Sequence, residues 1–257
     1  AHFATYDCDT FGENGNCLSL GGRISHIENP DTETKSFILV YGKKLSNNFR
    51  VASFLHDNRS QKTNSNFSLS DKTPLLGALL VWYKTLDGSG LRLKIGNSYQ
   101  KKNLQTTRQQ IGVSERAIGE TILRAESIFG EVRYDKRISD SFKLSPFIAI
   151  RTSNKTQQGY TETSANNPLS YNTINIESDT LLIGTHINKS LGDRFAINTV
   201  LGLEYDTSYN ASSIAPTGIN GLTTVKLESD YEDKRAVIAL GFDYDYDQEK
   251  KLIAKIQ

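Results

Sequence analysis

The residues of this chain best suited to catalysis are its four histidines, His2, His26, His56 and His186. A serine nucleophile needs a histidine base within hydrogen-bond reach, and none of the four stands in a recognisable Ser/His motif. His56-Asp57 is an isolated dyad, which gives only weak support to a protease. The sequence also has no phosphate-binding loop, metal-ligand cluster or nucleotide fingerprint. We therefore expect no catalytic residue, no metal site and no cofactor.

The two cysteines, Cys8 and Cys17, lie close together in the sequence. In an oxidising periplasm they would form a small disulfide-closed loop, and the alternative is a pair of free thiols. Their spacing is too wide for a CxxC redox motif, and two cysteines alone do not make a zinc site. We predict the disulfide Cys8–Cys17.

Charged side chains alternate with apolar ones along several segments, which places them on opposite faces of a strand. In residues 235–246 the apolar face ends in two tyrosines, whereas Asp243 and Asp245 lie on the other face. Residues 91–96 repeat the pattern, with leucine and isoleucine on one face and arginine and lysine on the other. An apolar face suits lipid, and a charged face suits a narrow aqueous lumen.

The charged residues on these second faces are the candidate site of the protein. The residues that we predict to line the lumen are Arg23, Arg92, Lys94, Arg151, Glu204, Arg235, Asp243 and Asp245. In residues 119–136 we also expect Glu131 and Arg133 to point inward. These groups could contact a segment passing through the lumen, or they could form salt bridges with one another in water; the two interpretations are compatible.

Connections of alternating length join the segments that must position these charges. Eleven strands are predicted, at 17–27, 35–44, 49–57, 74–85, 91–101, 119–136, 142–153, 176–189, 194–207, 231–246 and 250–257. Short polar turns are expected at 45–48, 86–90, 138–141, 190–193 and 247–250, and long polar loops at 57–73, 101–118, 154–175 and 207–231. Short turns on one side and long loops on the other are typical of an up-and-down outer-membrane barrel, not of a soluble sandwich.

Strand parity makes a further prediction. A sheet in hydrocarbon must close, because an unpaired edge leaves backbone groups unsatisfied, and bacterial single-chain barrels have even strand numbers. We therefore expect an all-β, up-and-down antiparallel transmembrane β-barrel of twelve strands, with about eleven present in this chain. Residues 1–16 are expected to be a leader or linker remnant, in the lumen or disordered, and 17–257 a barrel domain that lacks its last strand. Alternatively, a segment is missed, for example at 221–227.

Composition agrees with a membrane barrel. Hydrophobic residues make up 37% of the 257 residues, which is low for a soluble core of this size but enough when only the outward face is apolar. No run of 18 apolar residues suggests a transmembrane helix. The chain begins Ala1-His2-Phe3-Ala4 and contains no methionine or signal peptide, as expected of a mature or excised product. The net charge of +1, without a basic block, argues against a nucleic-acid partner.

A resemblance to a known family adds to this interpretation. Residues 144–151 read Leu-Ser-Pro-Phe-Ile-Ala-Ile-Arg, and 159–162 read Gly-Tyr-Thr-Glu. They resemble the x-P-F-A-x-L-R…G-[FY]-x-E stretch of the autotransporter β-domain, the translocator of type V secretion. Residues 201–205 and 239–244 are similar to later strands of that family, so the resemblance runs in order along nearly the whole chain.

The resemblance implies a twelve-stranded barrel in the bacterial outer membrane, with a helical linker in its pore and an N-terminal passenger outside. Two features differ, since the chain ends Lys255-Ile256-Gln257 without the family's final aromatic-ended strand, and no clear linker helix precedes the first strand. The expected function is to anchor the passenger and help to export it. The expected partners are outer-membrane lipid, the passenger or linker segment in the pore, and the barrel-assembly machinery. Alternatives are a passive porin or channel, a barrel protease or lipase, and a soluble β protein.

Overall fold

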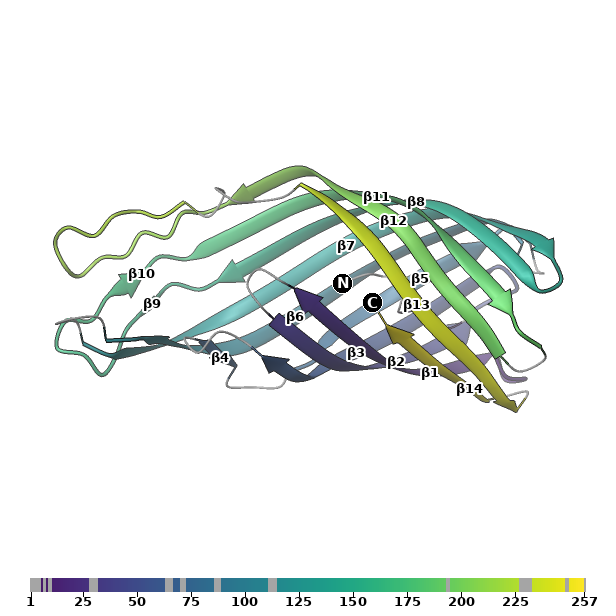
Figure 1. Ribbon diagram of the computed structural model, residues 1–257, viewed down its shortest axis with the longest axis horizontal. Coiled ribbons are helices and arrows are strands. Elements are labelled where there is room, and N and C mark those ends of the chain that lie inside the picture. Colours follow the sequence, from purple (N-terminus) through teal and green to yellow (C-terminus); the bar gives the residue numbers. More distant parts are fainter. Residues whose placement is uncertain are drawn as a thin grey trace.

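A single antiparallel sheet curls round to form the wall of a barrel in the computed structural model (Figure 1). The structure describes residues 6, 8, 11–27, 32–62, 67–69, 73–85, 89–110, 115–192, 195–226, 233–247 and 250–256. Within them, no helix is long and apolar enough to cross a membrane.

Eleven strands follow one another round the wall, each hydrogen-bonded to the next. They are β1 (Asn16–Ile27), β2 (Thr32–Lys44), β3 (Phe49–Lys62), β5 (Leu75–Tyr83), β6 (Gly90–Arg108), β7 (Ala117–Ser139), β8 (Phe142–Gln157), β11 (Ile174–Ser190), β12 (Phe195–Ala211), β13 (Lys234–Asp247) and β14 (Lys250–Ile256). The short strand β4 (Phe67–Leu69) pairs with the far end of β6, and β9 (Tyr160–Thr161) pairs with β10 (Ser170–Tyr171) in a separate hairpin. The predicted all-β, up-and-down antiparallel architecture is confirmed.

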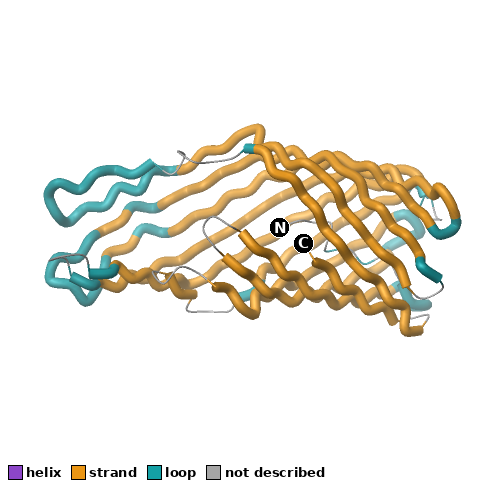
Figure 2. The backbone as a smooth tube through the Cα atoms, in the orientation of Figure 1, coloured by secondary structure: helices purple, strands orange, loops and turns teal. Residues whose placement is uncertain are grey.

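From β2 onward the connections alternate in length, as predicted; the connection from β1 to β2, residues 28–31, is also short. Short turns join β2 to β3, β5 to β6, β7 to β8, β11 to β12 and β13 to β14, and they gather at one end of the barrel. The long connections gather at the other end, where they carry most of the loop structure in Figure 2. We call these the short-turn end and the long-loop end.

The strands β1 and β14, which stand at the two ends of the sheet order, lie beside each other. Their Cα atoms approach within 8 Å, and Figure 1 shows the two strands side by side. Ten antiparallel pairings lead from β1 round to β14, so these two strands run in the same direction. The wall therefore combines antiparallel neighbours everywhere along the sheet with a parallel seam.

Several strands are longer than the sequence predicted, and the expected long loops are correspondingly shorter. Strand β6 continues to Arg108, β7 starts at Ala117, β8 reaches Gln157 and β12 reaches Ala211. Beyond the apolar band the outward-facing residues become polar, so the alternation that marks a strand disappears from the sequence while backbone pairing continues. A crossing needs only about 10 residues per tilted strand, and the remainder projects beyond the bilayer.

An exposed apolar band surrounds the wall. Among its outward side chains, 39–68% of the surface is exposed: Leu93, Ile95, Ile128, Val132, Ile148, Ile150, Ile183, Leu201, Leu203, Ile238 and Leu240. Outward aromatic residues lie toward the two edges of the band, with Tyr41, Phe49 and Tyr134 toward the short-turn end and Tyr99 and Tyr205 toward the long-loop end. An apolar belt with aromatic edges matches the lipid-facing surface of an outer-membrane barrel.

The depth of this band can be measured on strand β8. Ile148 pairs with Val132 and Ile183 in the middle of the band, whereas Asn154 lies six residues further along the same outward face, beside Glu126. We expect Ile148→Arg to lower the free energy of unfolding in lipid vesicles by about 2–4 kcal/mol and Asn154→Arg by about 0–1 kcal/mol. Urea titration of both variants measures the difference, and equal costs would contradict the position of the band.

Candidate functional site in the barrel interior

The inward-facing side chains of β6 and β7 are charged and buried. Arg92 is 2% exposed and Lys94 is also buried, while Leu93 and Ile95, their neighbours along β6, point outward. Three of the other predicted residues, Arg23, Asp243 and Asp245, lie on β1 and β13, but their side chains fall outside the described part of the structure.

Ion pairs link the charges on the inner faces of β6, β7 and β8. The Lys94 ammonium lies 3.7 Å from a Glu131 carboxylate oxygen. The Asp135 carboxylate lies 3.0 Å from Arg133 Nε and 3.6 Å from the Lys143 ammonium. The sequence had indicated Lys94, Glu131 and Arg133 as inward residues, but it had not indicated Asp135 or Lys143. Each of the two carboxylates thus has at least one cation nearby, as burial of a charge requires.

A second network brings together three predicted residues from different strands. Glu204 on β12 contacts Arg151 on β8 at 3.2 Å and Arg235 on β13 at 3.3 Å. Arg235 also lies 2.8 Å from Asp206, which accepts a hydrogen bond from the Thr180 hydroxyl (2.6 Å). Arg151 donates to the same hydroxyl oxygen at 3.3 Å. Asp206 was missed, although it follows Glu204 at the strand period of two.

A stack of cations and aromatic rings lies on the inner faces of β3, β5 and β6. The Arg50 guanidinium lies 4.0 Å from the centroid of the Tyr83 ring and donates to its hydroxyl oxygen (3.1 Å). Arg92 approaches the same ring at 4.8 Å, and Arg50 also lies 4.8 Å from the ring of Phe11. Cation–π contacts of this kind stabilise buried arginines, and here they bind the segment before β1 to the wall.

The segment that precedes β1 lies against the inner wall. Tyr6 is fully buried; its ring stacks on Phe54 with centroids 3.9 Å apart, and its hydroxyl lies 2.6 Å from His56 Nδ1. Together with its neighbours it forms an apolar cluster inside the barrel. The buried members of this cluster are Tyr6, Cys8, Cys17, Ile38, Val40, Phe54, Leu79 and Phe129.

The predicted disulfide Cys8–Cys17 is present. Cys17 lies on β1, directly across from Gly42 on β2, and Cys8 packs over the same glycine. A Cβ at position 42 would lie 3.2 Å from Cys8 Cβ, so the absence of a side chain there makes room for the disulfide.

This apolar cluster explains why β2 is apolar on both faces. Ile38 and Val40 point inward and are almost completely buried under the N-terminal segment, whereas Leu39 and Tyr41 belong to the outward face. A lumen filled only with water would call for polar residues at the inward positions.

The described residues before β1, which are 6, 8 and 11–15, lie along the inner wall from the short-turn end toward the long-loop end. A turn at residues 12–15 joins this N-terminal segment to β1 at the short-turn end, where the Lys44 amide donates to the Gly15 carbonyl oxygen (2.8 Å). Phe11 contacts Arg50 at the beginning of β3, and Tyr6 contacts Phe54 and His56 further along that strand. Going backward from β1, the chain therefore heads toward the long-loop end.

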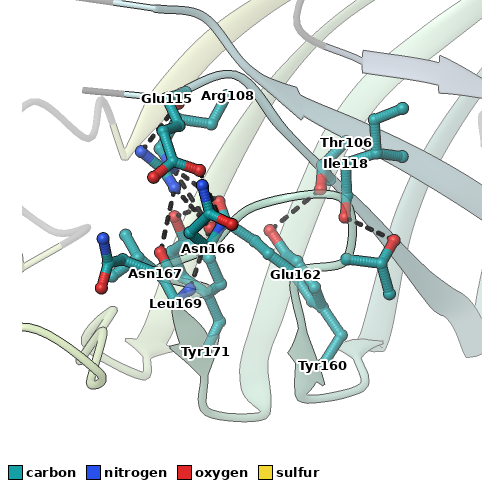
Figure 3. Close-up of polar contacts among 11 residues, drawn as sticks. Thr106, Arg108, Glu115, Ile118, Tyr160, Glu162, Asn166, Asn167, Leu169 and Tyr171 are labelled. Carbon is teal, nitrogen blue, oxygen red and sulfur yellow. Dashed lines mark hydrogen bonds and ion pairs between the residues drawn. The ribbon is translucent and has the colours of Figure 1, made fainter. Parts of the chain in front are cut away.

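A polar cluster outside the apolar band fixes the β9–β10 hairpin to the projecting ends of β6 and β7 (Figure 3). Arg108 on β6 donates two hydrogen bonds to the Glu162 carboxylate, from Nε and from Nη2, both at 2.9 Å. The Leu169 amide donates to the same carboxylate at 2.9 Å. Arg108 also donates to the Glu115 carbonyl oxygen (3.0 Å). Burial alone would raise the pKa of Glu162, but the hydrogen bonds from Arg108 and Leu169 outweigh it and lower the pKa.

Tyr160 and Tyr171 complete this cluster. Their rings stack with centroids 4.8 Å apart, and the Tyr160 ring lies over Gly119 on β7, where an added Cβ would approach it within 2.2 Å. Burial and the negative charge of Glu162 raise the pKa of Tyr171 to about 12. Tyr171 therefore keeps its proton and donates to Glu162 (3.4 Å). The Gly-Tyr-Thr-Glu stretch at residues 159–162 thus forms the centre of the polar cluster that attaches the β9–β10 hairpin to β6 and β7 outside the apolar band.

The histidines with described side chains take part in packing. His56 contacts Tyr6, and the His186 ring lies against Phe147 with centroids 4.8 Å apart. Among the described residues, no group of three or more His, Cys, Asp or Glu side chains is arranged to hold a metal ion.

Comparisons with known proteins agree on one family. A family model described as the autotransporter β-domain matches residues 21–252. Among solved structures, the chain is similar to the translocator domain of autotransporter NalP from Neisseria meningitidis, with a TM-score of 0.67 and 17% identity, over 93% of this chain and 78% of that chain. At this identity the likeness shows the fold. No curated protein matches the sequence.

The hairpin cluster makes a pH-dependent prediction. Because the pKa of Glu162 is lower in the folded protein, its contribution is complete above the ordinary carboxyl pKa of about 4.3 and is lost as the pH falls through the lowered value. In the wild-type protein, hydrogen-exchange protection of residues 160–171 should therefore fall below about pH 4. In Glu162→Gln, protection should already be reduced at neutral pH and should change little with pH. Glu120→Gln, at an exposed position on β7, is the matched control and should behave as wild type.

Proposed function

The chain belongs to the autotransporter β-domain family, and on this basis we propose that its barrel anchors an N-terminal passenger in the outer membrane and helps to export it. Membership makes the chain a translocator of the bacterial outer membrane that acts on a passenger segment. We also propose a direction of export, the residues along the path, the partners and a completed barrel.

The course of the N-terminal segment carries the proposal. This segment lies inside the barrel and leads backward from the turn at 12–15 toward the long-loop end. In outer-membrane barrels the short turns face the periplasm and the long loops face outward. A passenger that precedes Tyr6 would therefore lie on the outer side, while the barrel holds it in the membrane.

The charged half of the lumen supplies a hydrated path. Arg151, Glu204 and Arg235 form a network on β8, β12 and β13, which are not among the strands of the apolar wall β1–β3. A wall of fixed, mutually paired charges allows an extended polypeptide to pass without offering it a single strong binding site. We propose that Arg23, Arg92, Lys94, Asp243 and Asp245 belong to the same lining.

A passive channel is the second candidate that the sequence left open. The apolar cluster around Tyr6 occupies lumen that a porin would leave open to solutes. No catalytic role is proposed, because His56 and His186 contact aromatic rings in this structure.

The apolar band and the direction of β1 and β14 suggest the partners of the barrel and its complete form. The apolar band is suited to outer-membrane lipid, and insertion of such a sheet calls for the barrel-assembly machinery. Because β1 and β14 run in the same direction, a twelfth strand antiparallel to both could enter between them and restore the even strand number of bacterial barrels. Its entry would move β1 and β14 apart, since they approach within 8 Å and strands on either side of a third lie about 9.6 Å apart. On this proposal, residues 1–16 are the linker and residues 17–257 contain the barrel without that last strand.

Surface display of a reporter tests the export function. An epitope fused ahead of Ala1 and expressed behind a signal peptide should be detected by antibody on intact cells. Glu204→Lys places a third cation beside Arg151 and Arg235 and should lower the surface signal several-fold, whereas Glu177→Lys, at an exposed position, should leave it unchanged. An epitope that remains in the periplasm although the barrel is inserted would contradict export.

The orientation of the barrel has its own test. Epitopes inserted between Gly218 and Gly221 in the long-loop end, and between Ser46 and Asn47 in a short turn, occupy opposite ends of the barrel. The first should be labelled in intact cells and the second only after the outer membrane is permeabilised. The reverse pattern would overturn the assignment of the long loops to the cell exterior.

A further inference from the structure

We propose that the Cys8–Cys17 disulfide is a redox latch: it holds the N-terminal segment, through Tyr6 and Phe11, in a built-in receptor site on the inner wall of β1–β3 and keeps that part of the lumen closed to solutes. This inference concerns the closed state of the barrel and is independent of whether a passenger is exported.

The receptor site is shaped for an aromatic side chain. Phe54 provides a flat apolar surface for the Tyr6 ring, and His56 provides a polar partner for the Tyr6 hydroxyl at 2.6 Å. Gly77, on the neighbouring strand β5, has no side chain to obstruct Phe54, since an added Cβ would lie 2.1 Å from that ring. A tyrosine that is apolar along its body and polar at its tip is thereby satisfied at both ends.

Removal of the segment would expose an apolar wall to the aqueous lumen. Ile38, Val40 and Leu79 are each at most 3% exposed and point inward beside Phe54. Inward apolar positions are unfavourable in a wet lumen, and the hydrophobic effect therefore favours an occupied site. This wall is thus built for an occupant, and the segment from Tyr6 to Cys17 supplies it.

The disulfide keeps the N-terminal segment on the inner wall of β1–β3. Cys17 is part of β1 and pairs with Gly42 on β2, and Cys8 lies over the same glycine. The disulfide therefore fixes the segment to the beginning of β1. Phe11 adds a contact with the cations of Arg50 and Lys44, at 4.8 and 5.4 Å from its ring centroid. While the disulfide is intact, Tyr6 is held close to its site at high effective concentration.

Reduction would release the latch. An external dithiol donates two electrons through thiolate attack on one sulfur; the Cys8–Cys17 bond is cleaved to two thiols, and the dithiol closes to its own disulfide. The N-terminal segment would then be joined to the wall only by its main-chain connection to β1 and by non-covalent contacts, so Tyr6 could leave its site and open that part of the lumen.

Conductance in planar lipid bilayers tests the latch. Dithiothreitol should raise the mean conductance of the wild-type barrel several-fold, and a thiol-reactive polyethylene glycol should report on gels that both cysteines became free. The double variant Cys8→Ser/Cys17→Ser should show the raised conductance at once and should not respond to dithiothreitol. Tyr6→Ala should be intermediate under oxidising conditions and rise further on reduction, whereas Tyr99→Ala, on the outward face, should match wild type.

Folding is checked separately by the heat-modifiable mobility of each variant on gels, so that only folded barrels are compared. Two results would overturn the proposal: a wild-type conductance that stays within twofold after the disulfide is shown to be reduced, or a folded double-serine barrel with wild-type conductance. Because the measurement needs no passenger, a failure of the latch and a failure of export are distinguishable.

Discussion

The structure depends above all on the need to pair every backbone N–H and C=O group that crosses the hydrocarbon. Hydrocarbon offers no hydrogen-bond partner, so the sheet must curl until its two edge strands meet. Closure fixes the other features, because in a closed sheet successive side chains alternate between lipid and lumen. Leu93 and Ile95 on the outside and Arg92 and Lys94 on the inside are consequences of that one constraint. The strands continue past the apolar band because the pairing pattern, once established, also satisfies the backbone in water.

The interior then has to stabilise what the alternation places there. Charges that point inward have partners, either opposite charges, as in the Arg151–Glu204–Arg235 network, or an aromatic ring, as for Arg50 and Arg92 on Tyr83, because a charge removed from bulk water needs one. Where apolar residues point inward, as on β2 and β3, the N-terminal segment covers them. The charged and the apolar parts of the inner face thus satisfy the same need to compensate desolvation in different ways.

The sequence predicted the features that depend on one strand at a time. The alternation, the short turns and the order of eleven strands follow from local patterns, and so does the closeness of Cys8 to Cys17. Contacts between side chains on different strands could not be predicted, because a single sequence does not reveal the register in which neighbouring strands pair. Asp206 was therefore not predicted, although Glu204 on the same face of β12 was. The hydrogen bond from Arg108 to Glu162 likewise joins positions 54 residues apart. Strand ends were missed where outward residues became polar.

The seam and the N-terminal segment are physically connected. Strand β1 shares an antiparallel ladder with β2 on one side and runs parallel to β14 on the other. The two ends of the sheet order approach each other at this seam, so it is a place where the wall benefits from other support. Cys17 belongs to β1, and the cluster of Tyr6, Cys8 and Phe54 packs across the inner face of β1–β3 beside that seam. The N-terminal segment therefore acts on the wall as well as on the lumen: it covers the apolar inner face and is bonded through Cys8 to β1, the strand beside the seam.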